Sequence, residues 1–280
     1  MTQYVNLNGK VINEKNATVS VNNRSFRYGD GCFETIKVVN GEARLAEFHF
    51  DRLFASLKLL QFEWPSFFTP IFLLQSIKEL VVKNQHQKLA RVRLTIFRGE
   101  GGLYDPEHQH PNYLIQSWVL NPENNNLNDN GLVIGTYPIG FKAADALANL
   151  KSNNFLLYAM AALHSKQHYW NDALILNHKG TFADATIANL FIITQKAIIT
   201  PPLTDGPVEG TMRRHLLQHL PALGYSVLEQ SIAPKDLQQA DECFLTNAIY
   251  GIKWVQQHRD TIFQRRHILT IHKDLIKSIW

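Results

Sequence analysis

The segment Gly180-Thr-Phe-Ala-Asp-Ala-Thr-Ile-Ala-Asn-Leu-Phe191 is the most informative part of the chain. Gly180 indicates a turn, and the carboxylate of Asp184 is followed by the amide of Asn189, where a strand is predicted to begin. Taken alone, the segment has two interpretations: a hairpin turn with a polar tip, or a polar pair that serves a binding site. The motifs that flank the segment have to decide between them.

The composition is that of an ordinary folded protein. The chain has 280 residues, of which 45% are hydrophobic and 19% charged, so it can bury a core without disulfides and is not expected to be disordered. No window approaches about 18 uninterrupted apolar residues, and we therefore expect no membrane span and no membrane partner. The net charge of +4 is scattered along the chain, which does not indicate a nucleic-acid partner.

Cysteine and histidine usage predicts neither a disulfide framework nor a metal site. Cys32 and Cys243 are too few for a framework and lack metal-ligand spacing. His164 and His168 lie four residues apart, but no glutamate follows His164 in the metalloenzyme pattern, so a helix surface is favoured. The N-terminal residues lack a signal-peptide pattern, and we expect a cytoplasmic protein.

An Asn-rich stretch, Asn121-Pro-Glu-Asn-Asn-Asn-Leu-Asn-Asp-Asn130, interrupts the chain with residues that favour turns. We expect a smaller N-terminal α+β domain over residues 1–120, a linker over 121–130, and a larger domain over 131–280 that carries Lys151. Strands and helices mix without strict alternation, so the predicted fold class is α+β rather than a doubly wound sheet.

Local patterns predict the elements of both domains. Asn-Gly pairs at 8–9 and 40–41 predict hairpins. Apolar residues at helical spacing predict helices over 47–60, 69–83, 154–168 and 210–220. Strands are expected at 33–39, 43–45, 90–97, 113–120, 132–137, 173–176, 189–194, 197–200, 225–229, 243–246 and 252–256, with a helical C-terminus.

Three further features carry groups that can serve chemistry. Lys151 precedes a predicted helix, and a lysine becomes a nucleophile in a desolvated pocket; otherwise it is a surface charge. Arg52 lies on a helix with an apolar opposite face, and would either fork onto a phosphate or pair with a surface acid. The loop Gly206–Arg213 opens a helix whose backbone N–H groups can bind an anion, although many helix starts bind nothing.

In this order, the motifs together resemble the class IV aminotransferases, pyridoxal-phosphate enzymes of fold type IV. That family includes branched-chain and D-amino-acid aminotransferases and aminodeoxychorismate lyases, and the resemblance covers nearly the whole chain. The matching segments are Asn23–Glu34 (leading into the active site), His49-x-x-Arg52-Leu (phosphate-binding arginine), Lys151-Ser (Schiff-base lysine), Gly180–Phe191 (family signature), Gly210-Thr-Met-Arg (second phosphate-binding turn) and Phe244-Leu-Thr-Asn-Ala-Ile (last active-site strand and loop).

The resemblance implies a two-domain fold like that of D-amino-acid aminotransferase, with pyridoxal 5'-phosphate in the cleft between the domains. It implies a homodimer in which the loop Gly99–Tyr104 would close the partner's pocket. Lys151 would be catalytic, Asp184 would lie at the ring nitrogen, and no metal is expected. Cofactor binding is expected from Arg52, Asp184, Asn189, Thr211, Met212, Asn247 and Ala248. Substrate binding is expected from Tyr28, Phe33, Lys37, Arg98 and Ile249.

Three positions depart from the family pattern. Asp184 stands where the family usually has glutamate, which is one methylene longer. Ala248 stands where aminotransferases commonly carry a hydroxyl near the phosphate. Leu156 stands where branched-chain enzymes carry a tyrosine in the substrate pocket, which argues against a branched-chain specialist.

The reaction type has two main alternatives. Glu34-Thr-Ile-Lys37 and Lys151-Ser resemble aminotransferases, and we expect transfer of an amino group between an amino acid and a 2-oxo acid. Gly29-Asp-Gly-Cys-Phe, Arg98-Gly-Glu-Gly-Gly and Thr246-Asn-Ala resemble aminodeoxychorismate lyases, which form 4-aminobenzoate and pyruvate. A non-catalytic cofactor-binding or dimerisation module is a remote third reading, against which the joint presence of the lysine, arginine, carboxylate and phosphate turn speaks.

Overall fold

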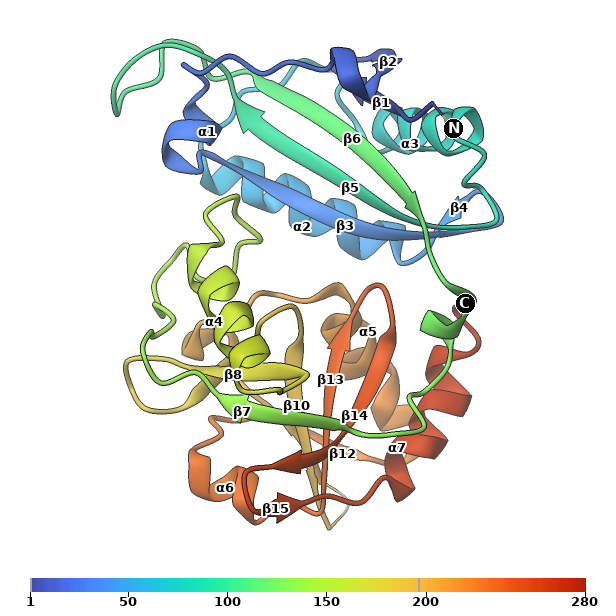
Figure 1. Ribbon diagram of the computed structural model, residues 1–280, viewed down its shortest axis with the longest axis vertical. Coiled ribbons are helices and arrows are strands. Elements are labelled where there is room, and N and C mark those ends of the chain that lie inside the picture. The colour runs from blue at the N-terminus through green and yellow to red at the C-terminus, as the bar shows by residue number, and fades with distance from the viewer. Residues whose placement is uncertain (1, 196) are drawn as a thin grey trace. The chain divides into compact units, whose positions relative to one another are not determined.

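The computed structural model describes residues 2–195 and 197–280. The chain folds as two compact units (Figure 1). The first comprises the chain up to Pro122 together with Leu150–Phe155, and the second comprises Glu123–Asn149 and Leu156–Trp280. The main division thus falls inside the Asn-rich stretch.

Residues 150–155, which we expected in the second domain, pack with the first unit instead. The Phe33 N–H donates a hydrogen bond to the Lys151 carbonyl at 2.9 Å, and the Asn153 N–H donates to the Gly31 carbonyl at 2.9 Å. These bonds lay the segment along the start of β3 (Gly31–Val39), where β4 does not reach. Lys151 is therefore a residue of the first unit, because its backbone completes the edge of that sheet.

The first unit is built on a six-stranded sheet with the order β2-β1-β6-β5-β3-β4, in which every neighbouring pair is antiparallel. The predicted Asn-Gly hairpins at 8–9 and 40–41 are present, and all four residues have the positive φ that type I′ turns require. Besides β3, the strands are β1 (Tyr4–Leu7), β2 (Lys10–Asn13), β4 (Glu42–Ala43), β5 (Leu89–Arg98) and β6 (Pro111–Val119).

Two helices cover one face of this sheet (Figure 1): α2 (Ala46–Leu59) packs on β3, and α3 (Pro70–Lys83) packs on β6 and β1. A short helix, α1 (Arg24–Tyr28), precedes β3, and a 3-10 turn, η1 (Glu14–Asn16), follows β2. Side chains alternate along a strand, so Ile36 and Val38 enter the core under the helices while Lys37 lies on the opposite face. Buried members of this core are Ile36, Val38, Leu53, Leu57, Leu73, Leu80, Leu94 and Ile96.

The second unit is built on a nine-stranded sheet with the order β12-β11-β10-β13-β14-β7-β8-β9, and β15 pairs with β14. β9 also pairs with β10 through Asp184 and Asn189, so the path from β10 through β13, β14, β7 and β8 to β9 closes on itself. The polar pair singled out in the sequence therefore lies where the sheet closes. The strands are β7 (Leu132–Thr136), β8 (Asp172–Leu176), β9 (Phe182–Ala185), β10 (Asn189–Thr194), β11 (Ala197–Thr200), β12 (Ser226–Glu229), β13 (Glu242–Asn247), β14 (Gly251–His258) and β15 (Thr261–Ile262).

Helices surround this sheet (Figure 1): α4 (Leu156–Gln167) packs on β8, while α5 (Thr211–His219) and α7 (Arg266–Ile271) pack on β13. The core contains Leu174, Phe182, Leu190, Ile192, Cys243, Leu245 and Val255. The other helical segments are α6 (Pro234–Gln238), the 3-10 turns η2 (Pro122–Asn125), η3 (Leu203–Asp205) and η4 (Leu220–Leu223), and the π-type turn η5 (His272–Ile276).

Most predicted elements are present, and the unpredicted ones are short. α1, α6 and β15 have five residues or fewer, too few to show an apolar period. β9 was not predicted either, because all four of its residues are buried and the alternation of a half-buried strand is absent. No described helix combines the length and apolar character needed to cross a bilayer.

Candidate active site

Glu34 is the centre of a buried polar cluster in the first unit. Its Oε1 accepts a hydrogen bond from Arg52 Nε at 2.7 Å, and its Oε2 accepts one from Arg52 Nη2 at 2.6 Å. His49 Nδ1 lies 2.6 Å from the same Oε2. His49 and Arg52 are three residues apart on α2, so both face the strand that carries Glu34. The predicted phosphate arginine is thus oriented by a buried bidentate contact.

This cluster keeps Glu34 ionised. Burial opposes ionisation of the carboxyl, but Arg52 and then His49 outweigh it and lower the pKa of Glu34 to about 2. Burial is also the main cause of the lowered pKa of His49, which favours a neutral imidazole at pH 7. The Glu34 carboxylate binds the Nε–Nη2 edge of the Arg52 guanidinium, which fixes the orientation of the group.

Lys151 lies against aromatic rings at the start of β3. Its Nζ is 4.6 Å from the centroid of the Phe33 ring and 5.2 Å from that of Phe155. The two rings meet edge to face at 5.3 Å, and the Arg93 guanidinium stacks on Phe33 at 3.7 Å. The backbone bond to β3 and these ring contacts together place Lys151 on the sheet face that Phe33 occupies.

Tyr28 and Lys37, two of the expected substrate residues, also belong to the first unit. Tyr28 ends α1 and packs against Tyr104 with ring centroids 5.7 Å apart. Lys37 is fully buried on β3, opposite Arg91 in the register with β5. A substrate role for these two residues stays a prediction.

Arg98 has the contacts of a structural anchor. Its Nε donates to Asp30 at 3.1 Å, its Nη2 donates to the Leu60 carbonyl at 2.5 Å, and its Nη1 donates to the Gln109 side chain. Arg24 Nε donates to the same Asp30 at 2.9 Å. Each nitrogen of the Arg98 guanidinium therefore donates within its own unit, which explains its burial without a substrate. A substrate role for Arg98 stays a prediction.

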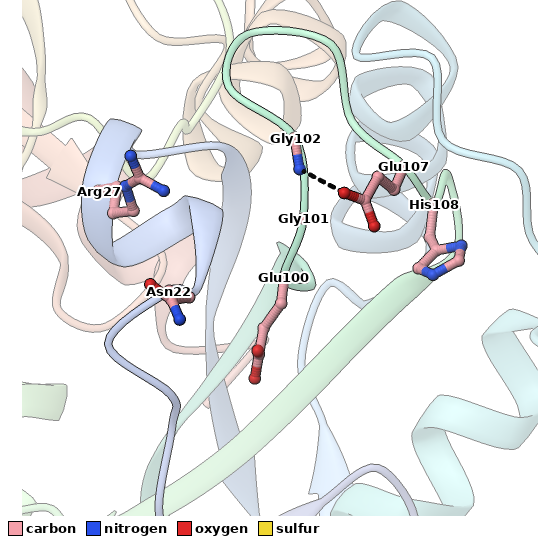
Figure 2. Close-up of a pocket in the computed structure, with 7 residues that line it drawn as sticks. All are labelled: Asn22, Arg27, Glu100, Gly101, Gly102, Glu107 and His108. Carbon is pink, nitrogen blue, oxygen red and sulfur yellow. Dashed lines mark hydrogen bonds between the residues drawn. The ribbon is translucent and has the colours of Figure 1, made fainter.

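The Gly-rich loop after β5 forms a pocket of about 410 Å³ with α1 and the segment before it. Figure 2 shows the Gly102 N–H donating to Glu107 across this loop, at 3.1 Å. The lining residues are Asn22, Arg27, Glu100, Gly101, Gly102, Glu107 and His108. They carry charges of both signs and include none of the candidate catalytic or cofactor residues, so we do not place the active site here. The role of Gly99–Tyr104 at a partner's pocket stays a prediction.

Asp184 is the corresponding buried carboxylate of the second unit. Its Oδ1 accepts a hydrogen bond from Asn189 Nδ2 at 2.9 Å. Its Oδ2 accepts bonds from the Val208 N–H and from the Tyr158 hydroxyl, both at 2.8 Å. Both Asp184 and Asn189 are at most 5% exposed, which rules out an exposed polar hairpin tip.

The electrostatics of Asp184 differ from those of Glu34. Burial raises the pKa of Asp184, and the Lys142 cation with three hydrogen bonds opposes the shift. A carboxylate oxygen accepts about two hydrogen bonds. Within residues 2–195 and 197–280, Oδ2 accepts two and Oδ1 accepts one. Oδ1 therefore retains one acceptor position, which fits an N–H donor such as a protonated pyridine nitrogen.

The start of α5 offers a place for an anion. Its N-cap, Gly210, supplies no side-chain cap, and the first helical residues, Thr211 and Met212, are buried. Glycine is required at 210, because a Cβ there would lie 1.8 Å from Asn189 Oδ1. The helix has nine residues, and the unpaired N–H groups and dipole of its first turn favour a phosphate.

A buried hydroxyl lies two residues before Ala248, where the family hydroxyl is missing. Thr246 on β13 is 1% exposed, and its Oγ1 has no hydrogen-bond partner in the described part of the chain. The register pairs Thr246 with Asn189, and Asn189 with Asp184, so the three side chains form a row across β13, β10 and β9. An unsatisfied buried hydroxyl is uncommon in proteins and fits a ligand oxygen.

The turn after β13 carries the last three candidates. Asn247 Oδ1 accepts hydrogen bonds from the Ile249 N–H at 2.9 Å and the Tyr250 N–H at 3.1 Å. Ala248 and Ile249 are half-buried within this turn. The contacts of Asn247 shape the turn, and its predicted role at the cofactor is not tested by them.

The candidates divide between the two units. The sequence analysis did not assign site roles to Glu34, His49, Lys142, Tyr158 and Thr246. The signal for His49 was present, because it precedes Arg52 by three residues on one helix face. Tyr158 gave no signal, since its contact with Asp184 joins residues 26 apart. The first unit carries Tyr28, Phe33, Lys37, Arg52, Arg98 and Lys151, and the second carries Asp184, Asn189, Thr211, Met212, Asn247, Ala248 and Ile249.

Comparison with known proteins places this fold and these motifs in one class. Residues 31–257 match the family of class IV amino-transferases, and the protein belongs to that family. The family is pyridoxal-phosphate-dependent, acts on amino acids and 2-oxo acids, and is typically oligomeric.

The relatives include both of the reaction types considered. An aminodeoxychorismate lyase of Vibrio harveyi is 30% identical over 236 residues, covering 84% of this chain and 85% of the relative. The branched-chain aminotransferase of Thermoproteus uzoniensis, solved with norvaline, has a TM-score of 0.89 at 24% identity, covering 99% of this chain and 96% of that one. The branched-chain aminotransferase of Escherichia coli has a TM-score of 0.87 at 21% identity, covering 99% and 96%. The expected two-domain α+β fold is confirmed.

Proposed function

We propose that the protein is a pyridoxal-phosphate-dependent aminotransferase that moves an amino group between an amino acid and a 2-oxo acid. Asp184 carries this proposal, because it is a buried carboxylate with one remaining acceptor position. It lies in a row with Asn189 and with the Thr246 hydroxyl, which has no hydrogen-bond partner among the described residues. Family membership supports the cofactor, since the family depends on pyridoxal phosphate.

The chain offers groups for each part of the cofactor. Arg52, oriented by Glu34, and the first turn of α5 would hold the phosphate, because both present donors to an anion. Thr246 would donate its hydroxyl to a cofactor or substrate oxygen. Asp184 Oδ1 would accept a hydrogen bond from the protonated ring nitrogen, and Lys151 would supply the amine that bonds the cofactor.

Pyridoxal phosphate, when bound, supplies an electron sink that makes removal of the substrate Cα proton possible. Lys151 Nζ would accept that proton and return it at the neighbouring position, acting as base and then as acid. An ionised Asp184 would keep the ring nitrogen protonated and so strengthen the sink. Glu34 would act through Arg52, by keeping the guanidinium in one orientation.

Product analysis tests the proposal directly. The purified protein, loaded with pyridoxal phosphate, is incubated with a panel of L- and D-amino acids and either 2-oxoglutarate or pyruvate. Formation of a new 2-oxo acid together with glutamate or alanine is the expected result. Failure of every donor in the panel, with the cofactor demonstrably bound, would refute transamination.

Aminodeoxychorismate lyase is the second candidate, and a specific observation favours it. The Vibrio harveyi relative is a lyase with 30% identity across most of both chains, and Ala248 lacks the hydroxyl common in aminotransferases. Both reactions begin with removal of a Cα proton, so the same residues would serve either one. Release of pyruvate and 4-aminobenzoate from aminodeoxychorismate would identify the lyase.

Assembly and location follow the family in this proposal. We propose a homodimer in the cytoplasm, which is consistent with a family whose members are typically oligomeric. Light scattering after size-exclusion chromatography should give twice the chain mass of 32.0 kDa, and a monomer would remove the dimer from the proposal.

A further inference from the structure

Lys142 and Tyr158 are linked to Asp184 by hydrogen bonds and have no role in the proposed mechanism. Lys142 lies after β7, where its backbone N–H donates to the Leu176 carbonyl at the end of β8, at 2.8 Å. Tyr158 lies on α4 and is 6% exposed. Lys142 Nζ is 2.7 Å from the Tyr158 oxygen, which in turn is 2.8 Å from Asp184 Oδ2.

The direction of these two hydrogen bonds follows from the chemistry of the groups. An ammonium can only donate, so the Tyr158 oxygen accepts from Lys142. The single phenol proton must then go to Asp184, which has to accept it. Burial and the adjacent Asp184 raise the pKa of Tyr158 well above its usual value, so the phenol keeps its proton. The phenol and the Val208 N–H thus fill both acceptor positions of Asp184 Oδ2, so this oxygen does not carry a proton.

Among the described residues, Lys142 is the cation that acts on Asp184, and it does so through Tyr158. The other partners of Asp184, Asn189 and the Val208 N–H, are neutral donors. Burial lowers the pKa of Lys142, while Asp184 and Asp145 act to raise it. Asp145 is exposed, so the buried acid facing the ammonium is Asp184, reached through the phenol.

We propose that Lys142 and Tyr158 are positioning residues that orient the Asp184 carboxylate and hold it in its charged form for the ring nitrogen of the cofactor. This inference rests on the proposed function for the role of the carboxylate at the cofactor. The charge coupling between Lys142 and Asp184 exists without the cofactor. Without the ammonium, only the hydrogen bonds would oppose the effect of burial, so the pKa of Asp184 would rise further. A protonated Asp184 would no longer stabilise a pyridinium.

A double-mutant cycle on the cofactor-free protein tests the coupling. Urea unfolding at pH 7 is compared for wild type, Lys142→Met, Asp184→Asn and the double variant. Lys142→Met should destabilise the protein, and adding Asp184→Asn should restore most of that loss, because the amide has neither a buried charge to compensate nor a proton to take up. Strictly additive effects would overturn the proposal. Lys253→Met is the matched control, since Lys253 is half-buried in the same unit and donates to the Asn126 carbonyl; its effect should add to that of Asp184→Asn.

Cofactor binding separates a positioning role from a merely structural one. The apoprotein is titrated with pyridoxal phosphate and with its 1-deaza analogue, which has no ring nitrogen. Wild type should prefer the natural cofactor. In Tyr158→Phe and Lys142→Met this preference should fall about tenfold or more, the equivalent of one pKa unit at Asp184, while the analogue binds as before. Lys142→Arg, which keeps the charge, should retain the preference.

The outcomes distinguish the two proposals. Equal loss of affinity for both cofactors would mean that the pair only supports the fold, and would overturn the inference. Tyr113→Phe, which removes a buried phenol from the first unit, is the control and should leave the preference unchanged. If wild type binds neither cofactor, the proposed function fails, and the double-mutant cycle still decides whether Lys142 is coupled to Asp184. Should Lys142→Met not fold, Tyr158→Phe replaces it in both experiments.

Discussion

Glu34 in the first unit and Asp184 in the second are both buried carboxylates, yet their surroundings act on them in opposite directions. Glu34 is 1% exposed and touches Arg52 directly through two hydrogen bonds, and its pKa falls to about 2. Asp184 is 2% exposed and meets three neutral donors, with Lys142 one phenol away, and its pKa is raised. A cation in direct contact outweighs burial, whereas neutral donors only moderate it.

The difference assigns the two carboxylates different tasks. Glu34 is a permanent charge that orients Arg52, because Arg52 and His49 outweigh the burial that would favour protonation. Asp184 is closer to the balance between its charged and neutral forms, so a ligand that carries a proton can shift that balance. Perturbed groups of this second kind are the ones that cluster at catalytic sites.

Lys151→Ala should have the largest effect, because neither carboxylate can act in catalysis without the amine that bonds the cofactor. Activity and the absorption band of the lysine-bound cofactor should both disappear. Borohydride reduction of the wild-type holoenzyme followed by peptide mapping should place the label on Lys151. A label on another lysine would show that the first unit does not carry the catalytic amine; Lys179→Ala, on the surface of the second unit, is the control.

Asp184→Asn should lower turnover by about 100-fold or more, since an electrostatic contact to developing charge is commonly worth about 3–4 kcal/mol. The amide keeps the shape but cannot favour a protonated ring nitrogen. Cofactor affinity should fall much less, because the phosphate contacts are untouched. Near-wild-type turnover would reduce Asp184 to a structural residue; Asp236→Asn, at the start of α6, serves as the comparison.

Glu34→Gln should change the response of stability to acid. The folded-state pKa of Glu34 is lowered from 4.5 to about 2, so its contribution is present above pH 4.5 and is lost as the pH falls towards 2. The difference in free energy of unfolding between wild type and Glu34→Gln should therefore depend on pH. It should be larger at pH 6 than at the acid end of this window, by up to about 3 kcal/mol. Urea unfolding from pH 6 to pH 3 measures the trend. A difference between the two proteins that does not change with pH would contradict it.

Arg52→Ala should weaken cofactor binding by roughly 10- to 150-fold, the equivalent of a charged contact worth about 1.5–3 kcal/mol. It should also destabilise the first unit, because Glu34 would be left buried without its cation. Arg52→Ala combined with Glu34→Gln should recover stability but not affinity. Affinity equal to wild type, measured by titration of the apoprotein, would show that Arg52 serves Glu34 alone; exposed Arg259→Ala is the control.

The smallest expected effect is on the pH dependence of stability at Asp184, which should have the opposite sign to that at Glu34. The folded-state pKa of Asp184 is raised above the ordinary 3.8, so the folded protein binds this proton more tightly than the unfolded chain does. The stability of wild type relative to Asp184→Asn should therefore rise as the pH falls through the raised pKa towards 3.8. Urea unfolding of the apoprotein over the same range as for Glu34 gives the comparison. Parallel slopes for the two carboxylates would mean that their surroundings are equivalent after all.

Local sequence was sufficient for most of the fold. The Asn-Gly hairpins at 8–9 and 40–41, α2, α3 and α5 followed from turn chemistry and apolar spacing, because these elements depend on residues within a few positions of one another. The order of the motifs was sufficient for the family, since each motif is short and contiguous. The class of protein was therefore determined by the sequence alone.

Contacts between distant residues were decided only by the tertiary structure. The sequence placed Arg52 on a helix with one apolar face. Only the tertiary structure brings Glu34 against it and buries the guanidinium in an ion pair. Arg98, which is predicted at the substrate, is held by partners from three separate segments that the sequence could not reveal. The segment that carries Lys151 joins the first unit through two backbone hydrogen bonds, made by Lys151 and Asn153 to the start of β3, which no side-chain pattern encodes. Burial and partner charge determine whether a carboxylate holds its proton, and both are properties of the folded chain, which is why Glu34 and Asp184 look alike in the sequence and behave differently in the protein.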